Sequence, residues 1–327
     1  MVGTILVVGG AGFIGSHVNQ RLHDNGYKTV VLDNLSRGAR QAVIEGDLVE
    51  GDFGDRALLE KLFEQYSFDA VMHFAAFTDV GESVQNPALY NEDNVVNTIT
   101  LLNTMVKHKL NNFIFSSSAA VYGTPGKDQV TETDPTIPIN PYGMTKLMVE
   151  QILQRYDHDY GIKSCSLRYF NAAGGDPAGI IKNYKKKENN LIPIVLRSLI
   201  NNSSVTIFGT DYPTPDGTGV RDYIHVMDLA DAHILAMVQL FNGGSTTCYN
   251  LGNGNGYSVR DVISMAEEVT GMKVDVIEGP RREGDPAILM ADATKAQNEL
   301  GWEQQHPDLK SMIQHAWNSY EGVGAKV

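Results

Sequence analysis

The sequence predicts an α/β protein built on a doubly wound parallel sheet, with a smaller lobe at the C-terminal side. In the first half, short apolar runs alternate with longer amphipathic ones, which is the pattern of parallel strands covered by helices on both faces. After residue 170 this regularity gives way to connections rich in Gly, Pro and Asn. We therefore expect a first domain over residues 1–170 and a second lobe over 171–327, with some segments of the second half returning to the first domain.

The elements of the first domain follow from hydrophobic periodicity. Apolar residues recur at three- and four-residue steps in the expected helices and form short continuous runs in the expected strands. The expected strands are 4–8, 28–33, 48–52, 70–74, 112–117 and 163–169. The expected helices are 13–25, 55–66, 87–107 and 141–160.

Composition narrows the class of protein. The chain has 327 residues, of which 42% are hydrophobic and 20% charged, and no apolar run is long enough to cross a bilayer. The N-terminus enters the apolar run 4–8 without a basic flank or a small-residue cleavage site, so we expect a strand there and a cytoplasmic protein. The lysine run 185–187 is expected to be a solvated loop.

Charge and metal-ligand spacing exclude further classes. The net charge of -13 opposes binding to nucleic acid and to anionic membranes. Cys165 and Cys248 lie in apolar segments without a neighbouring ligand, and the nine histidines do not repeat a metal-binding spacing. We expect no metal, no nucleic-acid partner and no membrane partner.

A glycine-rich turn follows the first expected strand and opens the first helix. It reads Gly9-Gly10-Ala11-Gly12-Phe13-Ile14-Gly15, with its glycines in the context of a Rossmann dinucleotide site. The free N–H groups of the helix start suit a pyrophosphate. Asp33 ends the second strand, where its carboxylate can bond the ribose hydroxyls and repel a 2'-phosphate, so NAD is favoured. Arg37 leaves NADP as the alternative, because a nearby arginine can bind that phosphate.

Tyr142 and Lys146 form a YxxxK pair on one face of the helix 141–160. A phenol is a poor base near neutral pH, but a nearby lysine cation and a positive nicotinamide ring favour its ionised form. Such a tyrosine can take the proton of a sugar hydroxyl while hydride leaves the same carbon. YxxxK alone is also common by chance, as a surface tyrosine beside a lysine. A serine run, Ser116-Ser117-Ser118, ends the preceding strand at the edge where doubly wound folds bind ligands.

The order and spacing of these motifs resemble the extended short-chain dehydrogenase/reductase superfamily. Motifs of the second half sharpen this match, and the sequence is similar to the UDP-glucose 4-epimerase family along nearly the whole chain. The matching segments are Arg168-Tyr169-Phe170-Asn171-Ala172-Ala173-Gly174, Asn190-Leu191-Ile192-Pro193, Phe208-Gly209-Thr210-Asp211-Tyr212, residues 216–225 through Arg221, and Arg281-Arg282-Glu283-Gly284-Asp285.

The resemblance implies a set of site residues. Catalysis would rest on Tyr142 as acid/base, on Ser118 at the reacting oxygen and on Lys146 at the nicotinamide ribose. The expected NAD contacts are Gly9, Gly12, Phe13, Ile14, Gly15, Asp33, Asn34, Asp52, Phe53, Phe74, Ala75, Ala76, Asn94, Ser116, Tyr142, Lys146 and Tyr169. The expected UDP-sugar contacts are Ser118, Tyr142, Asn171, Asn190, Leu191, Phe208, Arg221, Tyr223, Arg282 and Asp285.

Two departures from the family pattern affect these expectations. Thr78 stands where some members place a lysine near the cofactor phosphates, so a charge contact is replaced by a hydroxyl contact. Leu289 stands where the family usually has a tyrosine or a cysteine beside the C2 substituent of the sugar. Whether N-acetylated or pentose UDP-sugars also enter is therefore left open.

The expected reaction interconverts UDP-glucose and UDP-galactose through a 4-keto sugar on tightly bound NAD. A nucleotide-sugar dehydratase would need a carboxylic acid after Ser118, where Ala119 and Ala120 stand. Two competing hypotheses are a dehydrogenase that exchanges NAD with solvent and a catalytically inactive NAD-binding regulatory protein. By the same resemblance, helices that begin at Pro87 and Pro141 pair with those of a second subunit, so we expect a homodimer.

Overall fold

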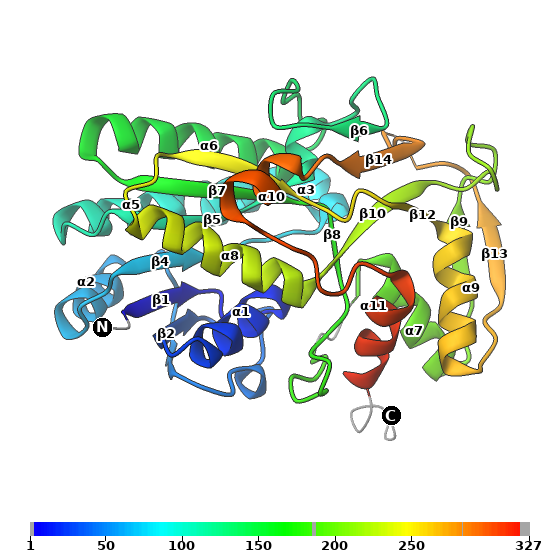
Figure 1. Cartoon of the computed structure of the whole chain (residues 1–327), viewed down its shortest axis with the longest axis horizontal. Coiled ribbons are helices and arrows are strands. Elements are labelled where there is room, and N and C mark those ends of the chain that lie inside the picture. Colours follow the sequence, from blue (N-terminus) through cyan, green and yellow to red (C-terminus); the bar gives the residue numbers. More distant parts are fainter. Residues whose placement is uncertain (1–2, 185–187, 283, 321–327) are drawn as a thin grey trace.

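A seven-stranded parallel sheet forms the centre of the larger lobe (Figure 1). The computed structural model describes residues 3–184, 188–282 and 284–320, so the lysine run 185–187 and Glu283 lie outside the described residues. The strand order is β3-β2-β1-β4-β5-β7-β11, and every neighbouring pair is parallel. The strands are β1 (Thr4–Val8), β2 (Lys28–Asp33), β3 (Asp47–Glu50), β4 (Ala70–His73), β5 (Asn112–Ser118), β7 (Lys163–Tyr169) and β11 (Thr247–Leu251). The predicted doubly wound sheet is confirmed.

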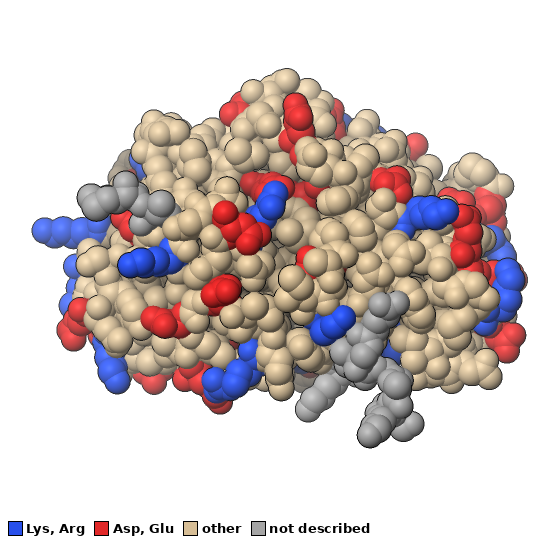
Figure 2. All heavy atoms as spheres, turned by 60° about the horizontal axis from the view of Figure 1, so that its bottom comes forward, with Lys and Arg blue, Asp and Glu red and all other residues tan. Residues whose placement is uncertain are grey.

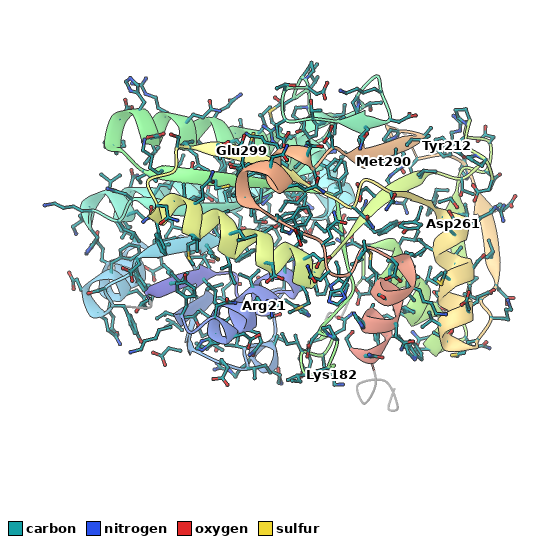
Figure 3. The ribbon with its side chains drawn as sticks, in the orientation of Figure 1. Arg21, Lys182, Tyr212, Asp261, Met290 and Glu299 are labelled. Atoms are coloured by element: carbon teal, nitrogen blue, oxygen red, sulfur yellow. The ribbon has the colours of Figure 1, made fainter. Side chains whose placement is uncertain are left out.

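Helices cover both faces of this sheet. One layer consists of α1 (Phe13–Asp24), α8 (Val226–Phe241) and α10 (Thr294–Leu300), and the other of α2 (Arg56–Gln65), α5 (Asn97–Lys107) and α6 (Pro141–Tyr160). Along β1, Ile5 and Val7 enter the core under the first layer, whereas Leu6 and Val8 enter the core under the second. Arg21 of α1 pairs with Asp231 of α8 at 2.6 Å, which ties two helices of one layer together (Figure 3).

The second lobe is a smaller α/β unit, which lies at the right of Figure 1. Its mixed sheet has the order β12-β10-β14-β6, with β8 paired to β10, and a separate ribbon joins β9 and β13. The strands are β6 (Gln129–Val130), β8 (Asn171–Ala173), β9 (Val205–Phe208), β10 (Val220–His225), β12 (Gly256–Ser258), β13 (Val276–Gly279) and β14 (Ile288–Ala291). The helices α7 (Leu191–Asn201), α9 (Val259–Thr270) and α11 (Leu309–Asn318) build its core against them.

Three segments from beyond residue 170, β11, α8 and α10, belong to the layers of the large sheet. Strand β11 pairs with β7, and α8 packs its buried face into the core under the first helix layer. The chain therefore passes from the large sheet to the small lobe and back. Strand β6, which precedes the expected boundary at residue 170, already pairs with β14 of the smaller sheet.

The range 87–107 is helical from end to end, as expected, but it contains a π turn that was not predicted. Helix α4 (Pro87–Asn91) passes into a single π turn, η2 (Glu92–Val96), before α5 begins. The cause is the side chain of Asn94, which accepts from the N–H of Phe77 (2.8 Å) and donates to its carbonyl (3.0 Å). This inward amide needs one more residue in the turn than an α-helix supplies. The helix α3 (Val80–Gln85) and the 3-10 turns η1 (Arg40–Ala42) and η3 (Ala119–Tyr122) complete the fold.

The described residues contain no helix with both the length and the apolar character needed to cross a membrane. On the face shown in Figure 2, basic and acidic side chains are interspersed and large areas are uncharged. This face therefore carries no continuous basic surface.

Candidate active site

The glycine-rich turn lies where β1 ends and α1 begins. Gly9 has a φ of +80°, and a Cβ added there would lie 2.4 Å from the backbone nitrogen of Ala75. A Cβ on Gly15 would lie 2.3 Å from the carbonyl oxygen of Gly9. Helix α1 begins at Phe13 without a side-chain cap on its N-terminal turn. The turn thus brings uncapped N–H groups close to the sheet edge, and these groups fit a pyrophosphate.

Asp33 joins the end of β2 to this turn. Its two carboxylate oxygens accept from the N–H of Ala11 (2.9 Å) and of Leu35 (2.8 Å). Burial raises the pKa of Asp33, and the two backbone hydrogen bonds oppose that rise. The carboxylate is therefore held in one orientation, and each of its oxygens has capacity for a further donor such as a ribose hydroxyl.

Arg37, which left NADP as an alternative cofactor, already forms an ion pair within the protein. Its guanidinium pairs with Glu82 at 2.9 Å and lies 5.1 Å above the centre of the Phe77 ring. A 2'-phosphate would have to compete with this carboxylate for the arginine. The arrangement favours NAD.

The residues expected at the adenine end contact one another. Asp52 accepts from the side-chain amide of Asn34 (2.9 Å) and from the N–H of Gly54 (2.7 Å). Phe53 is buried and meets the ring of His73 edge-on at 5.0 Å. After β4, the N–H groups of Phe74 (2.7 Å) and Ala75 (3.1 Å) both donate to the carbonyl of Val8, so residues 74–76 lie beside the glycine-rich turn. Thr78 is exposed beyond them.

The serine run at the end of β5 connects the large sheet to α6. The hydroxyl of Ser116 hydrogen-bonds to that of Tyr169, and its carbonyl accepts from Lys146 Nζ at 2.7 Å. Ser118 accepts from the N–H of Ala120 (3.2 Å) and hydrogen-bonds to Tyr142. Ser118 of β5 therefore meets Tyr142 and Lys146 of α6 at one sheet edge.

Helix α6 presents the YxxxK pair because of how it starts. Pro141 occupies its first turn, and Asn140 caps it by accepting from the N–H of Gly143 at 2.8 Å. Tyr142 and Lys146 are 9% and 2% exposed, and the lysine nitrogen lies 5.9 Å from the centre of the tyrosine ring. The pair is buried, so it is not the surface tyrosine and lysine that a chance match would place there.

Burial is the main cause of the pKa shifts of Tyr142 and Lys146. Burial raises the pKa of Tyr142, while the hydrogen bond from Ser118 lowers it. Burial also lowers the pKa of Lys146 to about 7. In the chain alone the lysine does not make the phenol a strong base, contrary to what YxxxK suggested. A further positive charge at the site is needed to favour the phenolate.

The residues expected around the UDP-sugar form several separate contacts in the second lobe. Arg282 stacks its guanidinium 3.9 Å above the centre of the exposed Phe208 ring. Arg221 of β10 lies 3.7 Å from the carboxylate of Asp285 and donates to the carbonyl of Val220. These two arginines are the cationic groups that would face a diphosphate.

The remaining expected residues lie near the joint between the lobes. Asn171 of β8 and Tyr223 of β10 are register partners, and the amide of Asn171 donates to the carbonyl of Asp222 at 2.8 Å. Asn190 precedes α7, and Leu191 is its first residue. Leu289 of β14 is the register partner of Arg221 and packs, partly buried, near Ala119.

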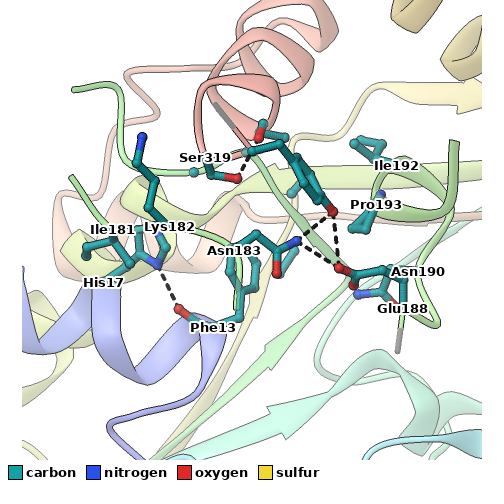
Figure 4. Close-up of a pocket in the computed structure, with 16 residues that line it drawn as sticks. Phe13, His17, Ile181, Lys182, Asn183, Glu188, Asn190, Ile192, Pro193 and Ser319 are labelled. Carbon is teal, nitrogen blue, oxygen red and sulfur yellow. Dashed lines mark hydrogen bonds between the residues drawn. The ribbon is translucent and has the colours of Figure 1, made fainter. Parts of the chain in front are cut away.

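A cavity separates the start of α1 from the start of α7 (Figure 4). It holds about 490 Å³ of empty space, part of which is open to solvent. Phe13, expected at the cofactor, and Asn190, expected at the substrate, both line it. On the far wall, Glu188 accepts from the amide of Asn183 (2.8 Å) and the hydroxyl of Tyr320 (3.1 Å). Among the described residues of its lining, Phe13 and Asn190 are the only expected site residues, so the cavity lies beside the catalytic residues and does not include Ser118, Tyr142 or Lys146.

Several residues of the site were not singled out from the sequence. Arg168 makes a bidentate ion pair with Glu150 behind Lys146, with side chains 8% and 6% exposed, and Ser117 also hydrogen-bonds to Glu150. An arginine inside an apolar strand was the signal for this pair. Asp93 in the π turn gave no such signal. Across the described ranges, no group of three or more His, Cys, Asp or Glu side chains could hold a metal ion.

Known proteins share both the sequence and this geometry. The family model of the NAD dependent epimerase/dehydratase family matches residues 5–252. A UDP-glucose 4-epimerase of Halalkalibacterium halodurans is 49% identical over 315 residues, which cover 96% of this chain and 94% of that protein.

Solved structures agree with these matches. The UDP-glucose 4-epimerase of Brucella ovis in complex with NAD has a TM-score of 0.94 at 44% identity, covering 97% of this chain and 98% of that chain. The enzyme of Bifidobacterium longum in complex with NAD+ and UDP has a TM-score of 0.92 at 38% identity, covering 99% and 100%. With the glycine-rich turn and the buried tyrosine and lysine in place, the chain belongs to the NAD dependent epimerase/dehydratase family.

Proposed function

We propose that this chain is a UDP-glucose 4-epimerase, an isomerase that interconverts UDP-glucose and UDP-galactose. The observation that carries the proposal is the convergence of Ser118, Tyr142 and Lys146 at the sheet edge beside the glycine-rich turn. Full-length relatives that bear this name support the choice of reaction. The reaction would place the protein in galactose metabolism.

The residues present fit a resident NAD. Side chains at Gly9 and Gly15 would collide with the backbone of Ala75 and Gly9, so the turn stays tight and leaves its N–H groups open to a pyrophosphate. Asp33, bonded to this turn through Ala11, would bind the adenosine ribose. Bound there, NAD supplies a reversible hydride acceptor for C4 of the sugar and a positive charge that favours ionised Tyr142. Lys146 would hold the nicotinamide ribose with those N–H groups that are not used by Ser116.

The chain's own residues move the proton. Tyr142 would accept the proton of the C4 hydroxyl at its phenolic oxygen and, once the 4-keto sugar has turned its opposite face to the hydride donor, return the proton to the C4 oxygen. Ser118, hydrogen-bonded to Tyr142, would bind the same sugar oxygen and hold it in line with the phenol. Tyr142 is buried and Ser118 partly buried, which limits the access of water to the 4-keto intermediate.

The second lobe would hold the part of the substrate that does not react. Arg221 and Arg282 would bind the diphosphate and nucleotide, with Phe208, Asn190 and the other expected contacts around them. Strong binding of this part leaves the sugar ring free to turn between its two faces. Leu289 is less bulky than a tyrosine at this position. We therefore also propose that N-acetylated UDP-sugars or UDP-pentoses are accepted, which the assay below tests.

A homodimer is part of the proposal. The helices α3 and α4 and the turn η2 pack beside α6 and leave apolar side chains exposed on this side of the molecule. They are Val80, Val84, Leu89, Val96, Met144 and Met148. A second copy of the chain would bury these side chains, which water otherwise contacts. We propose a cytoplasmic location for the dimer.

The test is epimerisation without added cofactor. Purified protein is incubated with UDP-galactose, and the C4 epimer is measured by chromatography, with UDP-N-acetylgalactosamine and a UDP-pentose as parallel substrates. We expect the epimer to form at a rate that does not depend on added NAD, and we expect acid denaturation of the protein to release bound NAD. A strict dependence on added NAD would indicate a dehydrogenase, and no epimer from any of the three sugars would overturn the proposal.

A further inference from the structure

Lys146 is a buried cation without a close anionic partner. It is 2% exposed, and its ammonium donates to the carbonyl of Ser116 at 2.7 Å and lies 4.9 Å from the centre of the Phe115 ring. Among the residues that the structure describes, no carboxylate forms an ion pair with it. An ammonium in such a place loses its proton more easily than one in water, so something must stabilise its charge from a distance.

Glu150 lies one helical turn after Lys146 but its charge is already matched. Arg168 holds both of its oxygens, at 3.0 Å and 2.6 Å, and Ser117 donates to it as well. A carboxylate neutralised by an arginine at this distance exerts little net field on a third group. Glu150 is therefore the weaker of the two carboxylates that favour the charged lysine.

Asp93 is the stronger one, and the π turn explains its position. The amide of Asn94 donates to the hydroxyl of Thr145 at 3.1 Å, so η2 is tied to α6 at the residue next to Lys146. Asp93 precedes Asn94 in that turn and is partly buried. It hydrogen-bonds to Asn97 but forms no ion pair within the described part of the chain. Its negative charge therefore has no ion-pair partner, and it lies on the turn that packs against the helix of Lys146.

We propose that Asp93 is a positioning residue of this active site, whose carboxylate keeps Lys146 protonated during the reaction. The inference rests on the proposed function, because it takes the charged lysine to be the active form. The π turn then has a function, because it directs Asn94 towards Thr145 and brings Asp93 to the side of α6 that carries Lys146.

The other titratable groups around Lys146 do not replace Asp93. On α6 these are Tyr142 and Glu150, of which the second is paired with Arg168. On β4, His73 is neutral, because burial and the nearby Lys146 lower its pKa to about 3. Burial and the nearby Asp52 raise the pKa of Asp93 to about 6. The Asp93 carboxylate is therefore ionised above about pH 6. Removing this carboxylate lowers the pKa of Lys146 only above that pH, where it carries its negative charge.

The test compares Asp93→Asn with the matched control Glu92→Gln, which removes one carboxylate from an exposed position of the same turn. The pH profile of kcat/KM is measured with UDP-galactose for each protein. For Asp93→Asn we expect the alkaline limb to move down by about one pH unit, the shift that a unit charge several ångströms away produces in a partly screened site. Glu92→Gln should keep the wild-type limb, and Asp93→Glu should largely restore it.

A second readout does not use activity. The pKa of Lys146 is followed by NMR in protein labelled at lysine Cε, with its signal assigned by its loss in Lys146→Met. A lower lysine pKa in Asp93→Asn than in Glu92→Gln supports the proposal, and equal values overturn it even if Asp93→Asn loses activity. An inactive wild-type protein would instead refute the proposed function, while the NMR comparison would still decide the role of Asp93.

Discussion

The two edges of the site differ in how much of their structure exists before any ligand binds. At the edge of the large sheet, Tyr142 and Lys146 are buried and hydrogen-bonded to the serines of β5. In the second lobe, Phe208 is 38% exposed and the Asp285 side chain 42% exposed, with its arginine partner at 3.7 Å. Groups that transfer a proton need fixed geometry and exclusion of water, whereas groups that grip a flexible diphosphate can be ordered by it. The sheet edge is thus buried and hydrogen-bonded before any ligand binds, whereas Phe208 and Asp285 of the second lobe are exposed.

The largest effect is expected from Tyr142→Phe, which tests whether the buried edge performs the chemistry. Removing the phenolic oxygen should lower kcat about 10³-fold, because no other described hydroxyl on α6 meets Ser118 at this edge. Thermal stability and the amount of NAD released on acid denaturation should remain close to wild type. Turnover within tenfold of wild type would exclude Tyr142 as the acid/base.

The next effect concerns the buried ion pair of Glu150 with Arg168, which lies next to the YxxxK pair. Glu150→Ala leaves Arg168 buried without its partner, which should lower the free energy of unfolding by about 3 kcal/mol or more. Urea unfolding of the variant measures this. Arg260→Ala breaks a pair with Glu278 whose side chains are 42% and 57% exposed, and it should change stability by less than about 1 kcal/mol. Equal losses in the two variants would contradict the contrast between the edges.

Acid should weaken the buried edge through two histidines. Burial lowers the pKa of His73 to about 3 and that of His233 to about 4, whereas both titrate near 6.5 in the unfolded chain. The unfolded state therefore binds more protons below pH 6.5, and stability is lost as the pH falls from there towards 4. Each histidine contributes up to about 1.4 kcal/mol per pH unit. Unfolding curves at pH 7, 6 and 5 measure the slope, which His233→Gln should reduce.

The smallest of these effects is expected in the second lobe. Arg221→Ala should raise KM for UDP-galactose about tenfold with little change in kcat, because the arginine would contact the part of the substrate that does not react. Arg281→Ala is the control, since Arg281 pairs with Asp211 at 2.7 Å and stacks on Tyr212. A fall in kcat as large as that of Tyr142→Phe would place Arg221 in the chemistry rather than in binding.

Sequence patterns predicted correctly those helices and strands whose ends are determined by neighbouring residues in the chain. The bounds of β1, β2, β7 and α6 agree with expectation, because apolar runs and, for α6, the Asn140 cap are written in consecutive residues. The π turn and the return of β11 to the large sheet depend on contacts across the fold, so periodicity did not reveal them. The meeting of Ser118 with Tyr142 followed from motif order and family resemblance. The role of Arg37 could be decided only when Glu82 was seen beside it.

The π turn also has a consequence for how this chain can change length. Each residue of an α-helix turns the next by about 100°, so one extra residue between α4 and α5 fixes the rotation of everything after it. Asn94 points inward before the turn ends, and Leu101, Leu102 and Met105 enter the core after it. Deleting one residue from Glu92–Val96 would rotate one of these groups away from its partners. The number of residues in this segment is therefore constrained independently of their identity, and a deletion there should be far less tolerable than most substitutions.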